Sequence, residues 1–566
     1  MRTGKIVFGL AGVLLGVFAL CGCAGRDVPG QTEPGQERKE QTETGQEKME
    51  QTEAGQEKME QKETGEPETE EADRFKTEEE SPAALFEGME LTESYKGLED
   101  TNPLMTQRFG ADPYAMVYDG RVYFYMTADA FVYDGAAGKL AENTYGRIRS
   151  INVISTSDMV NFTDHGAIQA AGEKGAAAWA KNSWAPAAVW KEIDGKPRFF
   201  LYFADAGGGI GVLVSDSPTG PFTDPLGKGL VTRETPNCAD VLWLFDPAVL
   251  LDDDGKAYLY FGGGVPEGKV SDPGTARVVE LGNDMISLAG DPVCIDAPYL
   301  FEDSGIHKVG EKYYYTYCTN WQVDQEGTDR YGFHNAEIVS MESDSPLGPF
   351  TFKETILENP GKYCGLYGNN HHCIFSFQDN WYITYHTRVL EKAMGVELGY
   401  RCTHVDEFSM GEDGTIGIIK QTMDGRRQLG FVDPYVRNRA ANMAVMGGIE
   451  CVPADDTARA CGSGNMALGK IDPGDFILVK GVDFGSQAPT EWIASVRNPE
   501  GNKGAVKICA DGPDGEVLGY LSITDASEAF TDFSVPLEQS VTGVHDLCLV
   551  FAGEGYEIDS WQFQKQ

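Results

Sequence analysis

Four polar residues recur at one position of a weak repeat, and their types suit hydrolytic chemistry. Asp112, Asp246, Glu302 and His371 each stand about seven or eight residues ahead of a turn. Each alone is ordinary, because an Asp before Pro often starts a strand or caps a turn. Their shared position predicts that the four side chains meet in one pocket. There, one protonated and one ionised carboxyl group can cleave a glycosidic bond, while a third raises the acid's pKa by like-charge repulsion.

The repeat that must position these residues runs from about Leu85 to Tyr435. Its five copies contain YDGRVYFYMT (118–127), IDGKPRFFLYF (193–203), DDGKAYLYFGG (253–263), VGEKYYYTYCT (309–319) and QDNWYITYHT (378–387). Each copy has a turn flanked by alternating large residues, which is typical of a β-hairpin. Five copies in the same internal order predict a five-bladed β-propeller, whose first strands line the axis. A large β-sandwich is the alternative.

The N-terminus predicts export and a membrane anchor. Basic Arg2 and Lys5 precede an apolar stretch at 6–20, and Cys21-Gly22-Cys23 follows. We interpret residues 1–22 as a lipoprotein signal peptide and Cys23 as the lipidated residue; a single transmembrane anchor is the alternative. Four acidic ten-residue copies then begin at 31, each with a glycine. They predict a disordered linker over 23–84 in preference to a solvated helix.

Composition limits the function classes. The formal net charge of −42 excludes nucleic acid as a partner, because phosphate binding needs a basic face. The ten cysteines that follow Cys23 show no zinc-type spacing, so we expect no metal cluster. Export permits disulfides, but buried thiols fit equally well.

The stretches ADPYAMVYDGRVYFY, NSWAPAAVW, FDPAVLLDDDGKAYLYFGGG, APYLFEDSGIHK and NNHHCIFSFQDNWYITYHTR occur in the order of a known family. The chain from about Asn102 to Asp433 resembles glycoside hydrolase family 43, particularly its arabinoxylan arabinofuranohydrolase and xylosidase branch. The resemblance implies a five-bladed propeller that inverts the anomeric centre. It implies that Asp112 is the general base, that Glu302 is the general acid, and that Asp246 orients Glu302 and raises its pKa.

The resemblance also implies binding residues. His371 would contribute to a water-ringed calcium ion at the propeller axis, with His372 as the alternative. Arg388 would contact sugar, and Trp184 would line the pocket, although a core Trp is comparable. Asp303 follows Glu302 where the family more often has a small residue, and this extra carboxylate is expected to shift the acid's pKa.

The last part of the chain resembles a second family. IDPGDFILVKGVDFGS (471–486) and VHDLCLVFAGEGYEIDSWQF (544–563) are similar to a family 6 carbohydrate-binding module, a β-sandwich (jelly roll). Lys470 stands where that family has a sugar-stacking Tyr, and the partner aromatic is expected at Phe530. Glu450 and Asp559 fit a second, structural calcium site, but Val452 replaces another acidic ligand. We expect Trp492 in the core and a module that packs against the propeller more than it binds sugar.

These inferences combine into one prediction. Residues 85–440 form the propeller and 448–566 the β-sandwich of an exported, membrane-anchored monomer facing outside. The expected activity is that of an inverting α-L-arabinofuranosidase on arabinoxylan, or a β-xylosidase, with arabinanase activity left open. A catalytically inactive surface glycan-binding lipoprotein and an adhesin are the alternatives.

Overall fold

The computed structural model describes residues 81–129, 132–134 and 139–565. The predicted signal peptide, Cys23 and the acidic repeats lie outside these residues. The described residues form one compact unit. In the described part, we find no helix of the length and hydropathy that crossing a membrane requires.

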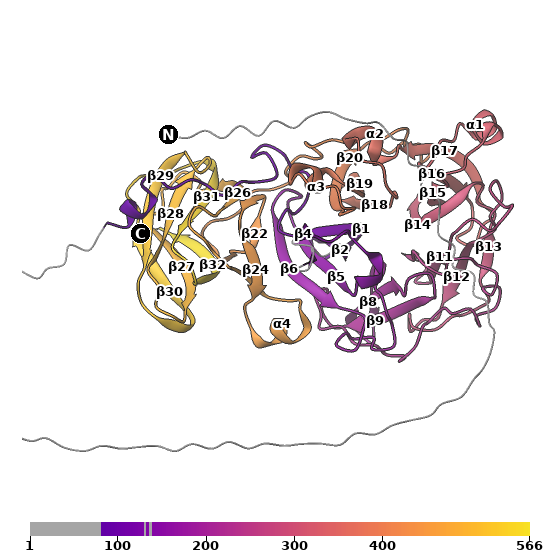
Figure 1. Ribbon diagram of the computed structural model, residues 1–566, viewed down its shortest axis with the longest axis horizontal. Helices are drawn as coiled ribbons and strands as arrows, with labels where there is room; N and C mark the ends of the chain where they lie inside the picture. Colours follow the sequence, from indigo (N-terminus) through magenta and orange to yellow (C-terminus); the bar gives the residue numbers. More distant parts are fainter. Residues whose placement is uncertain (1–80, 130–131, 135–138, 566) are drawn as a thin grey trace, which may run out of the picture. The chain divides into compact units, whose positions relative to one another are not determined.

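The unit is all-β, as predicted, with short helices between strands (Figure 1). The helical segments are η1 (Pro82–Phe86), η2 (Tyr145–Arg147), α1 (Gln325–Tyr331), α2 (Pro360–Cys364), α3 (Val389–Ala393) and α4 (Asp456–Cys461). The antiparallel sheets up to residue 408 follow one another in chain order.

The first two sheets comprise β1 (Phe109–Tyr118), β2 (Arg121–Asp129), β5 (Ser150–Thr156), β6 (Phe162–Gln169) and β22 (Asn442–Met443), then β7 (Trp184–Ile193), β8 (Lys196–Ala204) and β9 (Ile210–Ser215). The third comprises β10 (Ala248–Leu251), β11 (Ala257–Phe261), β12 (Ala276–Leu281) and β13 (Val293–Ile295). The fourth comprises β14 (Leu300–Val309), β15 (Lys312–Thr319), β16 (Ile338–Ser343) and β17 (Thr351–Leu357), and the fifth β18 (His372–Phe377), β19 (Asn380–Thr387) and β20 (Cys402–Phe408). A small ribbon pairs β3 (Tyr133–Asp134) with β4 (Lys139–Leu140).

All five predicted hairpins form, as the first two strands of these sheets. Asp119-Gly120 and Asp194-Gly195 each supply two consecutive positive φ angles. A two-residue hairpin turn of this kind matches the twist of the strands it joins, which explains why Asp-Gly pairs mark the turns.

The first strands of the five sheets contact one another in a closed cycle. β1 lies against β7, β7 against β10, β10 against β14, β14 against β18, and β18 against β1. Residues at the start of each first strand can therefore converge on a common centre, although they are far apart in sequence.

The C-terminal region is a β-sandwich, as predicted. One sheet has the order β24 (Glu450–Pro453), β25 (Met466–Gly469), β32 (Glu557–Gln564), β27 (Glu491–Asn498), β30 (Ser527–Pro536), with β21 (Asn438–Arg439) beside β32. The other has the order β23 (Val445–Gly447), β26 (Phe476–Asp483), β31 (Val544–Ala552), β28 (Gly504–Ala510), β29 (Glu516–Ile523). Trp492 is fully buried in the apolar core of this region, as expected.

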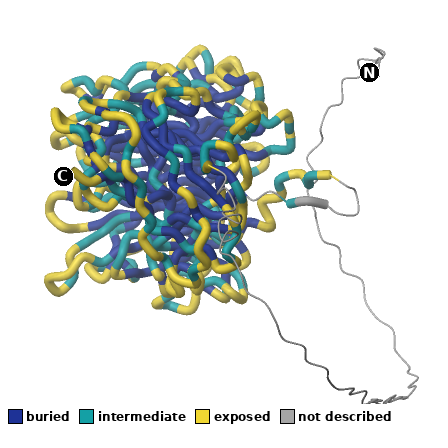
Figure 2. The backbone as a smooth tube through the Cα atoms, turned by 90° about the vertical axis from the view of Figure 1, so that its left-hand side faces the viewer, coloured by how far each residue is buried: buried dark blue, intermediate teal, exposed yellow. Residues whose placement is uncertain are grey.

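The sandwich contacts the first sheet along β6 and the segment before it. β22 pairs with β6, and Asn161 exchanges two hydrogen bonds of 2.8 Å with the backbone of Lys480. The segment ahead of β1 also binds the sandwich, since the backbone N–H of Thr92 donates to the carbonyl oxygen of Gly474 at 2.9 Å. Figure 2 shows that much of the backbone inside the unit is buried.

Candidate active site

The predicted catalytic residues line one cavity of about 510 Å³. Asp112, Asp246, Glu302 and His371 all contribute to its wall, and Trp184 does as well. All four polar residues are buried, at 5–7% exposure, so their charges interact with little screening by water. The repeat therefore brings together residues up to 259 positions apart, from Asp112 to His371.

Backbone bulges aim these side chains. Asp112, Asp246 and Asp303 have positive φ angles of 47°, 49° and 68°, and Ala185 takes the same position in the second sheet at 37°. The strand register shifts around these residues in β1, β7 and β14. Left-handed backbone is uncommon for residues other than glycine, and a bulge re-aims the side chains beside it. In the fourth sheet this position belongs to Asp303, so Glu302 stands one residue earlier than the repeat predicts.

Asp112 is held by cationic and imidazole groups. Its Oδ1 accepts a hydrogen bond of 2.9 Å from Arg401, and His386 Nδ1 lies 3.2 Å from the same oxygen. Burial alone would raise the pKa of Asp112, but the charge of Arg401, together with His386 and His371, holds it well below its usual range. Asp112 is therefore ionised at neutral pH, as a general base must be.

Arg401 is fixed in turn by Asp129. Its guanidinium donates to both carboxylate oxygens of Asp129, at 2.9 and 2.8 Å, and its backbone N–H donates to Asp129 at 3.1 Å. A bidentate pair of this kind restricts the orientation of the guanidinium plane. The ring of Tyr145 lies 4.6 Å from the same group.

The pKa values of Glu302 and Asp246 are shifted in the opposite direction from that of Asp112. Burial raises the pKa of Glu302 well above its usual value, and the charges of Asp246 and Asp112 raise it further. Burial and the charge of Asp112 likewise raise the pKa of Asp246. Oε1 of Glu302 is buried and has no hydrogen-bond partner among the described residues, so nothing in the structure stabilises its ionised form. The cavity thus combines an ionised carboxylate with a carboxyl group that retains its proton.

Asp303, the extra carboxylate, binds the two histidines. It lies 2.5 Å from His372 Nδ1 and 3.2 Å from His371 Nε2, and its charge adds to the raised pKa of Glu302. His372 uses its other nitrogen on Thr316 at 2.7 Å. Burial lowers the pKa of His371, which is therefore a neutral imidazole.

These contacts leave one nitrogen for a cation. His371 Nδ1 faces Asp112 and Asp246, at 3.7 and 3.8 Å from their nearest oxygens. The described residues hold no group of three or more His, Cys, Asp or Glu side chains arranged around a metal position. The donor set fits only a cation that keeps most of its water ligands.

Aromatic side chains form the rest of the wall and the rim. Trp243 packs edge-on against Phe245 and Phe301, and Trp184 donates its indole N–H to the carbonyl oxygen of Tyr145 at 2.9 Å. Trp321, between β15 and α1, lines the same cavity yet is 40% exposed. Such flat apolar faces suit the faces of sugar rings.

Arg388 lies outside the lining of this cavity. It borders a separate space of about 60 Å³, together with Tyr145, Asn369 and Arg401. Its Nε binds the carboxylate of Glu391, and its Nη1 donates to the carbonyl oxygen of Tyr367 at 3.2 Å.

Sequence reasoning missed five residues of the site: Arg401, Asp129, Tyr145, Trp321 and His386. Arg401 directly precedes β20 and Tyr145 lies in η2, so neither occupies the position shared by the repeats. Of the five, only His386 had a sequence signal that could have found it, because it lies two residues before Arg388 in the quoted YHTR stretch.

The candidate sugar site of the sandwich lacks two open aromatic faces. Lys470 pairs with Glu450 at 2.6 Å, and the guanidinium of Arg497 covers one face of Phe530 at 4.6 Å. Asp559 pairs with Arg439 at 3.0 Å. Both expected calcium ligands, Glu450 and Asp559, are thus neutralised by basic side chains.

The ten cysteines within the described residues are free thiols, and most are buried. Of the two alternatives for these cysteines, the structure therefore contains buried thiols without disulfides.

Comparison with known families assigns both regions. Residues 101–416 match glycosyl hydrolases family 43, and residues 439–565 match carbohydrate binding module family 6. The chain belongs to glycoside hydrolase family 43 and carries a family 6 module. It is a glycoside hydrolase, as predicted.

Individual relatives show which members of family 43 the chain is similar to. The chain is 44% identical to an arabinoxylan arabinofuranohydrolase of Paenibacillus polymyxa, over 82% of this chain and 74% of the relative. It is 42% identical to one of Bacillus subtilis (strain 168), over 83% and 94%. A crystal structure of a family 43 arabinoxylan arabinofuranohydrolase from Bacillus subtilis, in complex with cellotetraose, superposes with a TM-score of 0.78 at 39% identity. It covers 84% of this chain and 99% of that one.

Proposed function

We propose that this protein is an inverting α-L-arabinofuranosidase that removes arabinose from arabinoxylan. The observation that carries the proposal is the opposite protonation of carboxyl groups in one cavity, Asp112 ionised and Glu302 protonated. The two relatives and the solved structure described above support the choice of substrate. β-Xylosidase activity is the nearest other possibility in this family branch.

Different residues of the cavity carry out different parts of the proposed reaction. Asp112, held by Arg401, accepts a proton from the water that attacks the anomeric carbon. Glu302 gives its proton to the leaving oxygen, and Asp246 keeps that proton on Glu302 until then. The alternative of an inactive glycan-binding protein has no support, because none of these groups is missing or exposed.

We further propose that the five sheets are the blades of a five-bladed propeller. The closed cycle of contacts among β1, β7, β10, β14 and β18 supports this arrangement. The N-terminal sequence supports lipidation of Cys23 and an outward-facing enzyme, which we also propose is a monomer. Loss of membrane association in a Cys23→Ala variant would test the anchor, and unchanged association would contradict it.

The experiment that tests the activity compares substrates and product configuration. Wild-type protein should release arabinose from arabinoxylan and hydrolyse nitrophenyl α-L-arabinofuranoside faster than nitrophenyl β-D-xyloside. Proton NMR of the first product should show inverted configuration. Glu302→Gln is the matched control, and it should lose more activity on arabinoxylan than on the activated aryl glycoside, which needs no proton donor. Retained configuration, or activity confined to xylosides, would overturn the proposal.

A calcium ion at His371 belongs to the same proposal. His371 Nδ1 would be its protein ligand, with water completing the shell. When bound, the ion supplies positive charge that orients the cavity carboxylates. Chelation should lower activity and added calcium should restore it, while His371→Gln should not respond to calcium. Full activity of verified metal-free wild-type protein would contradict this part. A second calcium ion at Glu450 and Asp559 stays a prediction.

A further inference from the structure

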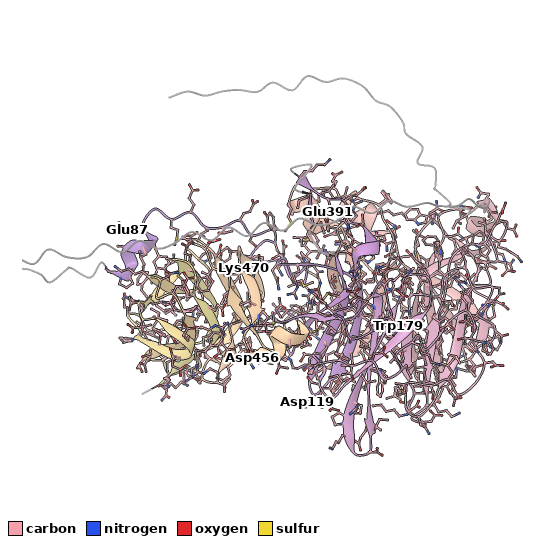
Figure 3. All side chains as sticks on the ribbon, turned by 60° about the horizontal axis from the view of Figure 1, so that its bottom comes forward. Glu87, Asp119, Trp179, Glu391, Asp456 and Lys470 are labelled. Carbon is pink, nitrogen blue, oxygen red and sulfur yellow. The ribbon has the colours of Figure 1, made fainter. Side chains whose placement is uncertain are left out.

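A buried carboxylate outside the cavity organises one of its walls. Glu391, labelled in Figure 3, lies in α3. Its side chain is fully buried. Its Oε2 accepts backbone hydrogen bonds from Leu398, Gly399 and Tyr400 at 2.9, 3.0 and 3.0 Å, and Arg388 binds its Oε1. A buried charge is tolerated only when it is paired and fully hydrogen-bonded. Three of these four donors are consecutive backbone N–H groups, so Glu391 holds the backbone of the 398–400 turn.

The turn leads directly into Arg401. The backbone N–H of Arg401 donates to Asp129, and its side chain bridges Asp129 and Asp112. The position of this guanidinium therefore depends on the backbone that Glu391 holds.

The same turn holds a second part of the wall. The carbonyl oxygens of Leu398 and Gly399 accept hydrogen bonds from Asn143 at 2.8 and 2.9 Å, and the hydroxyl of Tyr400 donates to Ala141 at 2.8 Å. Two residues after Asn143, Tyr145 lines the cavity and stacks on Arg401.

We propose that Glu391 is a positioning residue for the glycosidase reaction. Through the 398–400 turn it places Arg401 against Asp112 and Tyr145 at the cavity wall. The inference rests on the proposed function, because it takes Asp112 as the base. It goes beyond that function, since Glu391 does not line the cavity and acts only through other residues.

The first test is a double-mutant cycle. Glu391→Gln keeps the shape of the side chain but removes its charge. It should lower kcat on nitrophenyl α-L-arabinofuranoside about 10- to 100-fold per folded molecule, because small displacements of positioned groups cost this much. In an Arg401→Lys background the same change should have an effect of less than about threefold, since both substitutions act through one group. Equal effects in the two backgrounds would overturn the proposal.

Glu354→Gln is the matched control. Its carboxylate also accepts two consecutive backbone hydrogen bonds, from Ile416 and Gly417 at 2.7 Å each, but that turn does not line the cavity. It should leave kcat within about twofold of wild type, as expected for a substitution without a role at the site. If Glu391→Gln does not fold, Glu391→Asp keeps the charge but shortens its reach, and it should show a smaller loss of the same kind.

Hydrogen–deuterium exchange tests the positioning role of Glu391 independently of the proposed glycosidase activity. Glu391→Gln should speed exchange both in 398–401 and in 141–145, whereas Glu354→Gln should change neither segment. Unchanged exchange in 141–145 would overturn the positioning role even if the wild-type protein is an active arabinofuranosidase. If the wild-type protein hydrolyses no glycoside, the proposed function fails, and the exchange data still decide whether Glu391 holds both segments.

Discussion

The carboxyl groups of the cavity differ in pKa because their neighbours differ. Asp112 meets a guanidinium that Asp129 holds in place, whereas Glu302 meets mainly other acids and apolar walls. Burial strengthens both effects, since there is little water to screen them. One small space can therefore keep a base and an acid ready at the same pH.

Asp246→Asn should move the alkaline limb of the pH profile to lower pH. The pKa of Glu302 is raised by burial first and by the charge of Asp246 second. Removing that charge lowers the pKa, so Glu302 loses its proton at a lower pH. The acidic limb, which Asp112 sets, should stay in place. The measurement is kcat/KM on nitrophenyl α-L-arabinofuranoside against pH.

Asp252→Asn is the control for this shift. Asp252 is also buried, but it binds Lys308 and Tyr313 away from the cavity. An unchanged alkaline limb in Asp246→Asn, or an equal shift in Asp252→Asn, would argue against the assigned role.

Residue types and the repeat predicted which carboxylates meet, but not how each is aimed. Asp112 and Asp246 occupy the expected position, while the bulge at Asp303 displaces Glu302 by one residue. A bulge adds a residue without changing the hydrophobic pattern, so spacing alone does not reveal it. Arg401 was missed because it lies between α3 and β20, outside the position that the repeats share.

At the scale of elements, the hairpins were predictable because their turns are local. Asp119-Gly120 and Asp194-Gly195 adopt conformations that few other residue pairs take easily. The connection between β15 and α1 has no such signal. Its geometry depends on Asn320, which donates to the carbonyl oxygen of Val270, 50 residues away, at 2.9 Å.

This connection places Trp321 at the rim of the cavity. Trp321→Ala should lower activity on the polymer more than activity on small substrates. A sugar of the polysaccharide backbone can stack on the exposed ring, whereas an aryl arabinofuranoside ends inside the cavity. We expect kcat/KM on arabinoxylan to fall about tenfold, in keeping with an aromatic anchor worth 1–2 kcal/mol. The aryl substrate should change less than about twofold.

Phe431→Ala supplies the comparison, because Phe431 is 65% exposed and does not line the cavity. It should affect neither substrate. Equal losses on both substrates in Trp321→Ala would show that Trp321 supports the cavity instead of binding the polymer.

At the scale of the whole molecule, the sandwich contributes contacts more clearly than a sugar site. Asn161 joins the two regions through two partly buried hydrogen bonds to Lys480, while Lys470 and Phe530 contact Glu450 and Arg497. The family of the module was recognisable from sequence. The ion pairs that occupy its candidate site were not, since Glu450 and Lys470 pair across two strands.

Phe530→Ala and Lys470→Ala should therefore leave polymer affinity unchanged. Both are best made in the Glu302→Gln protein, so that the polymer stays intact. Affinity electrophoresis in soluble arabinoxylan should show the same retardation for all three proteins, because Lys470 has no ring and Arg497 already covers one face of Phe530. Retardation abolished by Phe530→Ala but not by Lys470→Ala would show that the module binds sugar there.

The contacts of the segment at 82–92, which precedes β1, have a mechanical consequence. Residues 82–92 bind the sandwich, with Phe86 packed 5.6 Å from Tyr520 and Thr92 hydrogen-bonded to Gly474 and Asp475. A pulling force applied ahead of residue 82 would reach these contacts before it reached β1. The sandwich would bear the load first, and the cavity between the catalytic sheets would keep its shape until those contacts sheared.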